Sequence, residues 1–559
     1  PSGASAGFLD FFLINIKRKL ALYGHQTLFR SYESLSQPVT TFNVSDVNVN
    51  CSIWNITRPD WPSRVGYTLS GNVASFSDHS SELQEYIVFG DNIPSPEFAG
   101  KVENQNLLAM GVHDFLIITH PDFLSEAERL AAHRRQHNGW KVAVATTPQI
   151  YREYSSGRQD VTAIRDFIRV LYNTDLKAVL LMGKASYDYK DRLEKNTNFV
   201  PTYQSRNSLS PLATYSSDDY FGFLEEHEGN WGESPVQHHT LDIGVGRLPV
   251  KTPEEARIVV DKIIYYDTHK NALGKWRKEI AFVGDDGNNS DNFTSSHQSQ
   301  ANVMAEMIES QHAGFDTKKI FLGTYAKTAK PNGEAIPEAN ADIVRRFDRG
   351  SLIINFTGHG NEKQWADENI FSIVEVEELE NKNYPFLVTA TCEFGRQDDP
   401  TIVSGAEMSI LHEKGGAIGL VTTSRPVNAG TNFVLNQQFY NALFQKESSL
   451  FPTLGGVFRN TKNNRSSGVG NRNFSLLGDP SMTLAIPSES VVVTKIQTKS
   501  GSDTLKALSP VVLEGEIHDE SGLLIEDFHG VIDFTLYDRQ VEFETIGKND
   551  PPFQYKEWQ

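Results

Sequence analysis

Two apolar, β-branched segments of this 559-residue chain each end in a reactive side chain close to glycine. The first ends in Gly358-His359-Gly360, and the second, residues 385–395, carries Cys392. The carboxyl ends of parallel strands meet at one edge of a sheet. Two neighbouring strands would therefore bring an imidazole and a thiol together. A thiol next to an imidazole is the smallest set of side chains for catalysis by a cysteine nucleophile with a histidine base.

Each of the two residues also has a simpler explanation. His359 is one of 16 histidines and Cys392 is one of two cysteines. A buried cysteine is more often a small apolar filler than a nucleophile. The glycines on either side of His359 favour the catalytic hypothesis, because they let the backbone turn tightly and approach a substrate closely.

A family resemblance supports the same hypothesis. The sequences Thr-Gly-His-Gly at 357–360 and Ala-Thr-Cys at 390–392, with Trp365 between them, resemble the gingipain-type cysteine peptidases (family C25) of the caspase-like clan. This resemblance covers about residues 112–484. Residues 392–400 are similar, more narrowly, to the PorU family, which are surface sortases of the type IX secretion system of Bacteroidetes.

The pattern of apolar residues predicts the fold. Alternating strands and helices in the middle of the chain indicate mostly parallel sheets covered by helices. Together with this pattern, the family resemblance implies the fold class: a caspase/gingipain-like α/β catalytic region of two α/β subdomains, flanked by an N-terminal β-rich module and a C-terminal immunoglobulin-like β module. The predicted domains are residues 1–111, 112–270, 271–486 and 487–559, the last being the start of a truncated module.

Several elements of the catalytic region are predicted individually. Residues 115–119, 352–356 and 386–390 read as buried strands. Ser125 is expected to cap a helix that runs to Gln136. Thr252-Pro253-Glu254-Glu255 carries three start signals of a longer helix: a Thr cap, a proline in the first turn and a glutamate three residues after the cap.

Composition excludes some classes of function. The net charge of −19 argues against nucleic-acid binding, which needs clustered lysine and arginine. The sequence contains no run of 18 or more apolar residues, so no membrane span is predicted. Cys51 and Cys392 are not expected to pair, because they lie in different predicted modules. The chain starts at Pro1 without a signal peptide, so we expect trimmed ends and a longer intact protein.

The resemblance assigns further catalytic groups. It implies that the backbone N–H groups of Gly360 and Cys392 form the oxyanion hole. It also implies an acidic residue that orients His359, and Asp286 occupies the matching position. Asp285 and Glu362 are the alternatives, and the acidic pair 285–286 would also suit a simple loop.

Three residues are expected to contact substrate. Arginine-specific gingipains have a carboxylate in the specificity pocket, and an ungapped match puts His297 at that position. A histidine would not pair with arginine or lysine, so a different specificity is expected. Trp365 could line the cleft or anchor the core. Glu393, directly after the nucleophile, is the third candidate.

No cofactor is expected to be required. The loop 285–291, the pair Asp218-Asp219 and the pair Asp398-Asp399 offer oxygen ligands, so a structural calcium ion is an alternative. None of them has the spacing of an EF-hand loop. No histidine or cysteine cluster has the spacing of a zinc site, and no residue is assigned as a metal ligand.

Three functions follow from these features. The resemblance implies a sortase that cleaves the C-terminal signal domain from exported cargo through a Cys392 thioester and transfers the cargo to anionic lipopolysaccharide. It also implies a place on the cell surface, on the outer side of a Gram-negative outer membrane, where the β-barrel PorV would hold the protein. The alternatives are a secreted gingipain-like endopeptidase and an inactive scaffold that binds signal domains.

Overall fold

The computed structural model shows two compact units, Pro1–Asn104 and Gln105–Gln559. Each unit has its own hydrophobic core. The residues that the structure describes are 12–98, 100–172, 175–206, 210–229, 239–286, 296–331, 333–447, 450–464, 468–498, 505, 508–530, 532, 535–546 and 552–558.

The first unit is a two-sheet β module, and the β-rich character predicted for this region is confirmed. One antiparallel sheet has the order β1-β7-β3-β4 and the other β2-β6-β5. Phe42, Phe76 and Tyr86 fill the core, with ring centroids 5.1 to 5.2 Å apart. Cys51 is buried in this core as a free thiol. The strands are β1 (Gln26–Arg30), β2 (Val39–Val44), β3 (Ser52–Asn55), β4 (Ser63–Val65), β5 (Thr68–Ser70), β6 (Val73–His79) and β7 (Glu85–Phe89).

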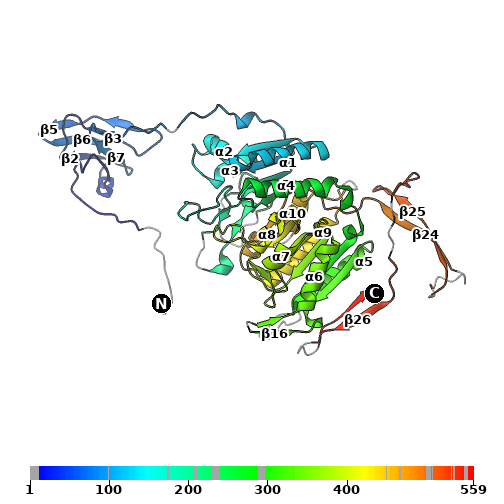
Figure 1. Ribbon diagram of the computed structural model, residues 1–559. Coiled ribbons are helices and arrows are strands. Elements are labelled where there is room, and N and C mark those ends of the chain that lie inside the picture. The colour runs from blue at the N-terminus through cyan, green and yellow to red at the C-terminus, as the bar shows by residue number, and fades with distance from the viewer. Residues whose placement is uncertain are drawn as a thin grey trace. The chain divides into compact units, whose positions relative to one another are not determined.

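A ten-stranded sheet forms the centre of the second unit (Figure 1). Its order is β15-β14-β18-β21-β22-β23-β13-β10-β8-β9, and all neighbouring pairs are parallel except β22 with β23. The predicted fold class is confirmed. The strands are β8 (Phe115–Thr119), β9 (Val142–Thr146), β10 (Ala178–Met182), β13 (Gly244–Leu248), β14 (Glu279–Gly284), β15 (Asp316–Phe321), β18 (Ile353–Thr357), β21 (Phe386–Ala390), β22 (Gly419–Thr423) and β23 (Phe474–Leu477).

Strands of both predicted α/β subdomains join in this one sheet. β23 lies between β22 and β13 and so connects the two halves. The pairing of β23 with β22 is antiparallel, while its pairing with β13 is parallel. The predicted boundary between residues 270 and 271 therefore divides strands that belong to one continuous sheet. The domain limits stay predictions.

Helices cover both faces of the sheet. In β8, Phe115 and Ile117 pack in the core that includes α1 and α4, whereas Leu116 and Ile118 pack with α3. Burial on both faces explains why these strands read as continuous apolar runs. The helices are α1 (Leu124–His137), α2 (Thr147–Tyr154), α3 (Val161–Tyr172), α4 (Pro253–Thr268), α5 (Ser296–Gln311), α6 (Pro337–Arg349), α7 (Ile373–Glu378), α8 (Gly405–Leu411), α9 (Ala429–Leu443), α10 (Leu454–Asn463) and α11 (Val469–Arg472).

The two predicted helix starts had different outcomes. α4 begins as predicted, because the Thr252 side chain accepts a hydrogen bond from the Glu255 N–H at 3.1 Å. The prediction for Ser125 is wrong, since α1 already begins at Leu124. A 3₁₀ turn at Pro121–Phe123 runs directly into α1, so Ser125 lies inside the first helical turn.

A buried ion network ties β23 to the helices of the other half. Asp479, which follows β23, is fully buried and accepts hydrogen bonds from Arg134 Nε at 2.9 Å and Nη2 at 2.7 Å. Arg134 on α1 also donates to Asp267 on α4 at 2.6 Å. Two carboxylates thus neutralise one buried guanidinium, and the network fixes three elements to one another.

The described part of the C-terminal region contains two antiparallel pairs, β24 (Ser490–Thr498) with β25 (Val511–His518) and β26 (Gln540–Glu544) with β27 (Gln554–Trp558). The second pair packs beside β15, where the Tyr555 ring centroid lies 4.6 Å from that of Phe321. Lys319 Nζ also donates to the Lys556 carbonyl at 2.8 Å. None of the helices among the described residues combines the length and apolar composition that crossing a bilayer requires.

Candidate active site

The two predicted catalytic segments end at the same level of the sheet. β18 pairs with β21 in parallel, and the last pair in register is Thr357 with Ala390. His359 lies two residues beyond Thr357, and Cys392 lies two residues beyond Ala390. The turns that carry the imidazole and the thiol therefore leave neighbouring strands at one edge, as the sequence predicts.

The turn of His359 packs directly against the turn of Cys392. A Cβ added to Gly360 would lie 2.6 Å from Thr391 Oγ1 and 2.8 Å from the Gln364 carbonyl oxygen. Thr391 immediately precedes Cys392. Glycine at position 360 is thus required by close packing between the two turns, in addition to any approach of substrate.

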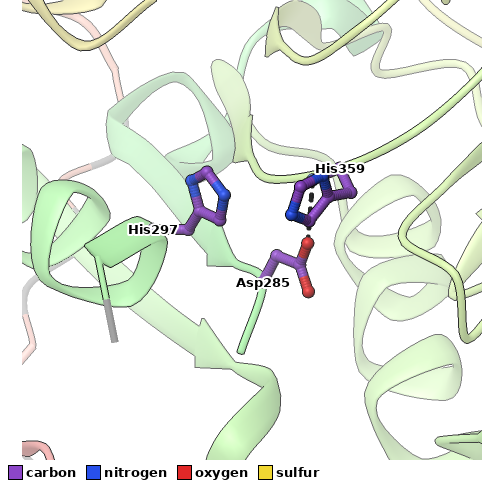
Figure 2. A group of neighbouring side chains, drawn as sticks. All are labelled: Asp285, His297 and His359. Carbon is purple, nitrogen blue, oxygen red and sulfur yellow. Dashed lines mark hydrogen bonds between the residues drawn. The ribbon is translucent and has the colours of Figure 1, made fainter. Parts of the chain in front are cut away.

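A third strand supplies a carboxylate to the His359 turn. β14 pairs with β18 on its other side, and Asp285 follows β14 directly. The buried Asp285 carboxylate accepts a hydrogen bond from the backbone N–H of His359 at 2.8 Å (Figure 2). A Cβ on Gly358 would lie 2.3 Å from the Asp285 Cβ, so a glycine is needed there as well.

Asp286, the residue first chosen to orient His359, has a different partner. Its carboxylate pairs with Lys327 at 2.8 Å, and Lys327 also pairs with Glu368 at 2.7 Å. Burial raises the pKa of Asp286, and Lys327 opposes that change. The carboxylate that contacts the His359 turn is thus Asp285, the alternative, while the role of Asp286 stays a prediction.

The loops after the two catalytic turns are joined by an ion pair. Arg396 Nη1 lies 2.8 Å from a carboxylate oxygen of Glu362, the other candidate for orienting His359, and 3.3 Å from one of Glu393. Gly405 at the start of α8 donates to the Glu362 carbonyl at 2.8 Å. Glu393 has a φ of +57°, a left-handed conformation that is rare outside glycine and often found at functional sites.

The surroundings of Cys392 raise the pKa of its thiol. The side chain is half-buried, and its Sγ donates to the Val427 carbonyl at 3.8 Å. Burial raises the pKa of the thiol, and the neighbouring Glu393 carboxylate raises it further, against the effect of Val427. Burial and Glu393 thus favour the neutral thiol over the thiolate.

His297 lies beside His359. It sits in the first turn of α5, and its ring is 5.2 Å from the His359 ring, edge to face (Figure 2). The start of α5 is fixed against the end of β14, since a Cβ on Gly284 would lie 2.9 Å from the Gln298 Cα. The structure therefore places His297, which the sequence match assigns to the substrate cleft, next to the candidate base His359.

Trp365 is a core residue in this structure. Its side chain is fully buried and stacks on Phe356 with ring centroids 4.8 Å apart. It also contacts Phe371 and Phe394 at 4.7 and 5.7 Å. Of the two roles considered for Trp365, the core anchor fits these contacts. A side chain with no exposed surface supports the His359 loop instead of lining a cleft.

The acidic pairs considered for calcium are matched to cations of the protein. Asp218 pairs with Arg247 at 2.7 Å, and Asp219 pairs with Lys462 at 2.8 Å. Arg425 Nη1 donates to Asp398 at 2.8 Å. Of the loop 285–291, residues 287–291 lie outside the described residues. Calcium binding therefore stays a prediction.

Comparison with known proteins agrees with this geometry. The family model described as Peptidase family C25 matches residues 110–485, which is more than half of the chain. The chain belongs to peptidase family C25. Gingipain R2 of Porphyromonas gingivalis is 25% identical over 239 residues, which cover 42% of this chain and 26% of that protein. The chain thus spans only about a quarter of the length of this relative.

Solved structures of C25 peptidases share the fold. The dimeric latent PorU from Porphyromonas gingivalis matches with a TM-score of 0.53 and 20% identity, over 96% of this chain and 47% of that one. The Arg-specific cysteine proteinase gingipain R matches with a TM-score of 0.51 and 18% identity, over 75% of this chain and 90% of that one. The C25 chain described here is therefore PorU-like in fold over nearly its whole length.

Proposed function

We propose that this C25 chain is a cysteine peptidase of the PorU type in which Cys392 is the nucleophile and His359 the acid–base. The observation that carries the proposal is the register of β18 and β21, which brings both turns to one edge at the same distance beyond the last paired residues. Membership of family C25 supports the same assignment. The transfer needs only these protein groups, and any calcium would have a structural role.

The first half of the reaction forms a thioester. Cys392 Sγ attacks the carbonyl carbon of the scissile peptide bond and transfers its proton to His359. The C–N bond breaks as His359 gives that proton to the leaving amine. The N–H groups of Gly360 and Cys392 stabilise the oxyanion that forms in between. Because burial raises the pKa of the thiol, we propose that this proton transfer accompanies the attack instead of preceding it.

The second half of the reaction decides between two products. With an amine as acceptor, its nitrogen attacks the thioester, His359 takes the proton, and an amide forms while the Cys392 thiol is restored. With water, the same steps give a carboxylic acid. The catalytic groups are the same in both cases, so peptidase and transpeptidase differ in the acceptor that reaches the thioester.

We propose that the acceptor is an amine of anionic lipopolysaccharide and that the donor is cargo carrying a C-terminal signal domain. The protein would then work as a sortase on the outer face of a Gram-negative outer membrane, held there by the β-barrel PorV. The fold shared with PorU over 96% of this chain supports this choice. The alternatives are a gingipain-like endopeptidase and an inactive scaffold for signal domains.

His297 supports the sortase over an arginine-specific endopeptidase. By the ungapped sequence match, it would take the position that a carboxylate has in the arginine-specific gingipains, and an imidazole does not bind a guanidinium as a carboxylate does. Recognition would then rest on the docked signal domain and on contacts close to Cys392, where Glu393 and Arg396 are half-exposed.

The test uses a reporter protein fused to a C-terminal signal domain, with glycine amide as a soluble amine. Intact mass spectrometry of the reporter follows its cleavage and the mass of its new carboxyl end. A glycine-amide adduct made by the wild-type protein and absent with Cys392→Ala supports the sortase. Hydrolysis alone favours the endopeptidase. No cleavage in the presence of PorV and the fusion would favour the scaffold.

A further inference from the structure

We propose that Asp285, His297 and His359 form a binding site for a transition-metal dication such as Zn²⁺, and that the ion switches the enzyme off. One nitrogen of each imidazole and one carboxylate oxygen of Asp285 lie within 4.8 Å of one another. Figure 2 shows the three side chains gathered at the end of β14, the start of α5 and the turn after β18. Metal binding is independent of the proposed function, whereas inhibition rests on it.

The backbone holds the three side chains in place. Asp285 follows the last residue of β14 and accepts the N–H of His359 at 2.8 Å, which fixes the carboxylate to the histidine turn. His297 is held by the start of α5, which packs closely against Gly284. The two rings already meet edge to face at 5.2 Å. The ligands therefore come from three elements that the central sheet positions.

The distances suit a small ion after minor rotation of the rings. Zinc binds imidazole nitrogen and carboxylate oxygen at about 2.0–2.2 Å, so neighbouring ligand atoms in a tetrahedral site are about 3.3 Å apart. The present upper limit of 4.8 Å requires movements of roughly 1 Å, which rotation of the histidine side chains provides. Of the three side chains, His359 is partly exposed, so an ion would enter the site from its side.

The ligand types select the metal. Two imidazoles with one carboxylate are a set that zinc, copper or nickel binds well, whereas calcium and magnesium prefer oxygen ligands alone. Three protein ligands leave a fourth tetrahedral position for water or another group. The site is thus expected to take Zn²⁺ at concentrations at which Ca²⁺ does not bind.

Ligation would engage one imidazole nitrogen of His359, and the proton of the neutral ring would then stay on the other nitrogen. A metal-bound imidazole nitrogen has no lone pair left to take a proton from Cys392 or to exchange protons with the amine. The ion would therefore stop the proposed reaction reversibly, and a chelator would restore it. His297 acts in this switch as a ligand of the ion.

Binding is tested in the Cys392→Ala chain, so that the nucleophilic thiol supplies no ligand. Isothermal titration calorimetry measures the affinity for Zn²⁺, with Ca²⁺ as the comparison ion. The visible absorption of Co²⁺, which reports tetrahedral imidazole ligation, is an independent readout. The variant is His297→Asn, and the matched control is His312→Asn, just beyond the other end of α5, where the imidazole stacks on Phe444.

We expect one Zn²⁺ per chain that excess Ca²⁺ does not displace, and a loss of Zn²⁺ affinity of at least about 10-fold in His297→Asn but not in His312→Asn. His297→Cys, which restores a zinc ligand, should regain affinity even where His297→Asn is unstable. Unchanged Zn²⁺ affinity in His297→Asn, or no binding to the starting chain, would overturn the site. If the chain with Cys392 intact binds Zn²⁺ and still cleaves its substrate, the metal site is supported. That result would contradict the catalytic role of His359.

Discussion

At the scale of single residues, the carboxylate beside His359 matters most. Asp285 is buried and accepts the backbone N–H of His359, whereas Asp286 is paired with Lys327. The sequence indicated an acidic orienting residue after this strand and ranked Asp286 ahead of Asp285, the residue whose carboxylate contacts the His359 turn. Adjacent residues beyond a strand end point in different directions, and this difference depends on the turn, which spacing alone does not reveal.

We predict that Asp285→Asn lowers kcat by about 10²-fold, because the imidazolium formed during the reaction loses a nearby negative charge. Asparagine keeps an oxygen that can accept the His359 N–H, so the turn should persist. Asp286→Asn should cost less than about 10-fold, since its charge is offset by Lys327. Steady-state kinetics on the fusion protein compares the two variants, and a larger loss for Asp286→Asn would restore the original assignment.

A second residue-scale prediction concerns the pH dependence of Cys392. Alkylation proceeds through the thiolate, and burial raises the pKa of this thiol, so it stays protonated to higher pH than an ordinary cysteine. The alkylation rate should therefore rise with pH, with a midpoint above that of a cysteine in an unfolded peptide. Site-resolved mass spectrometry of iodoacetamide labelling measures it. A midpoint near neutral pH would indicate a resting thiolate–imidazolium pair.

At the scale of elements, the buried strands were the most predictable. Residues 115–119 and 386–390 are strands with the predicted limits, because long β-branched runs have few alternatives. β13 and β23 were missed. β13 contains two glycines in Gly-Val-Gly-Arg-Leu, and β23 is four residues long, so neither has the pattern of a buried strand. Close backbone approach explains these glycines: a Cβ on Gly246 would lie 2.6 Å from the Gly478 carbonyl oxygen.

The contact between the two catalytic turns gives the element-scale prediction. Gly360→Ala would place its Cβ 2.6 Å from Thr391 Oγ1, so the turns of His359 and Cys392 must move apart. We expect a loss of activity of at least about 10²-fold, because misplacement of reacting groups by about 1 Å has that effect. Circular dichroism should show a retained fold. Gly314→Ala is the control, since its Cβ meets only Lys278 Nζ, at 3.6 Å.

Retained activity in Gly360→Ala would show that the turns tolerate the extra methyl group and do not need their present contact. The sequence suggested a role for this glycine through close approach of substrate. The structure adds packing against Thr391, which comes from a segment on the neighbouring strand. Such a contact follows from strand register, and register is not visible in one sequence without knowledge of which strands are neighbours.

At the scale of the whole molecule, one sheet carries the site. The strands β14, β18 and β21 lie side by side in the sheet in that order. They are followed by Asp285, His359 and Cys392, respectively. The sequence predicted that alternation of strands and helices would give parallel sheets, and this is confirmed. It did not predict that both halves share one sheet, because the connection through β23 depends on an antiparallel strand from the far end of the catalytic region.

The buried network around Arg134 gives a prediction for global stability. Arg134→Met leaves Asp479 and Asp267 buried without their common partner, so we expect a loss of about 3–5 kcal/mol in the free energy of unfolding. Denaturant unfolding measures it. Arg257→Met is the control, because that arginine is partly exposed and each of its pairs with Glu254, Asp261 and Glu413 should contribute less than about 1 kcal/mol. Equal losses would mean that the network does not tie β23 to α1 and α4.

The central claim is that Cys392 forms a thioester with the cargo fragment of a cleaved substrate. The most direct measurement is acid quenching of the reaction with the reporter–signal-domain fusion, followed by mass mapping of the protein. We predict an adduct on Cys392 that hydroxylamine removes, no adduct on the buried Cys51, and neither adduct nor cleavage in Cys392→Ala. Cleavage that persists in Cys392→Ala, or turnover without any adduct on Cys392, would contradict the account.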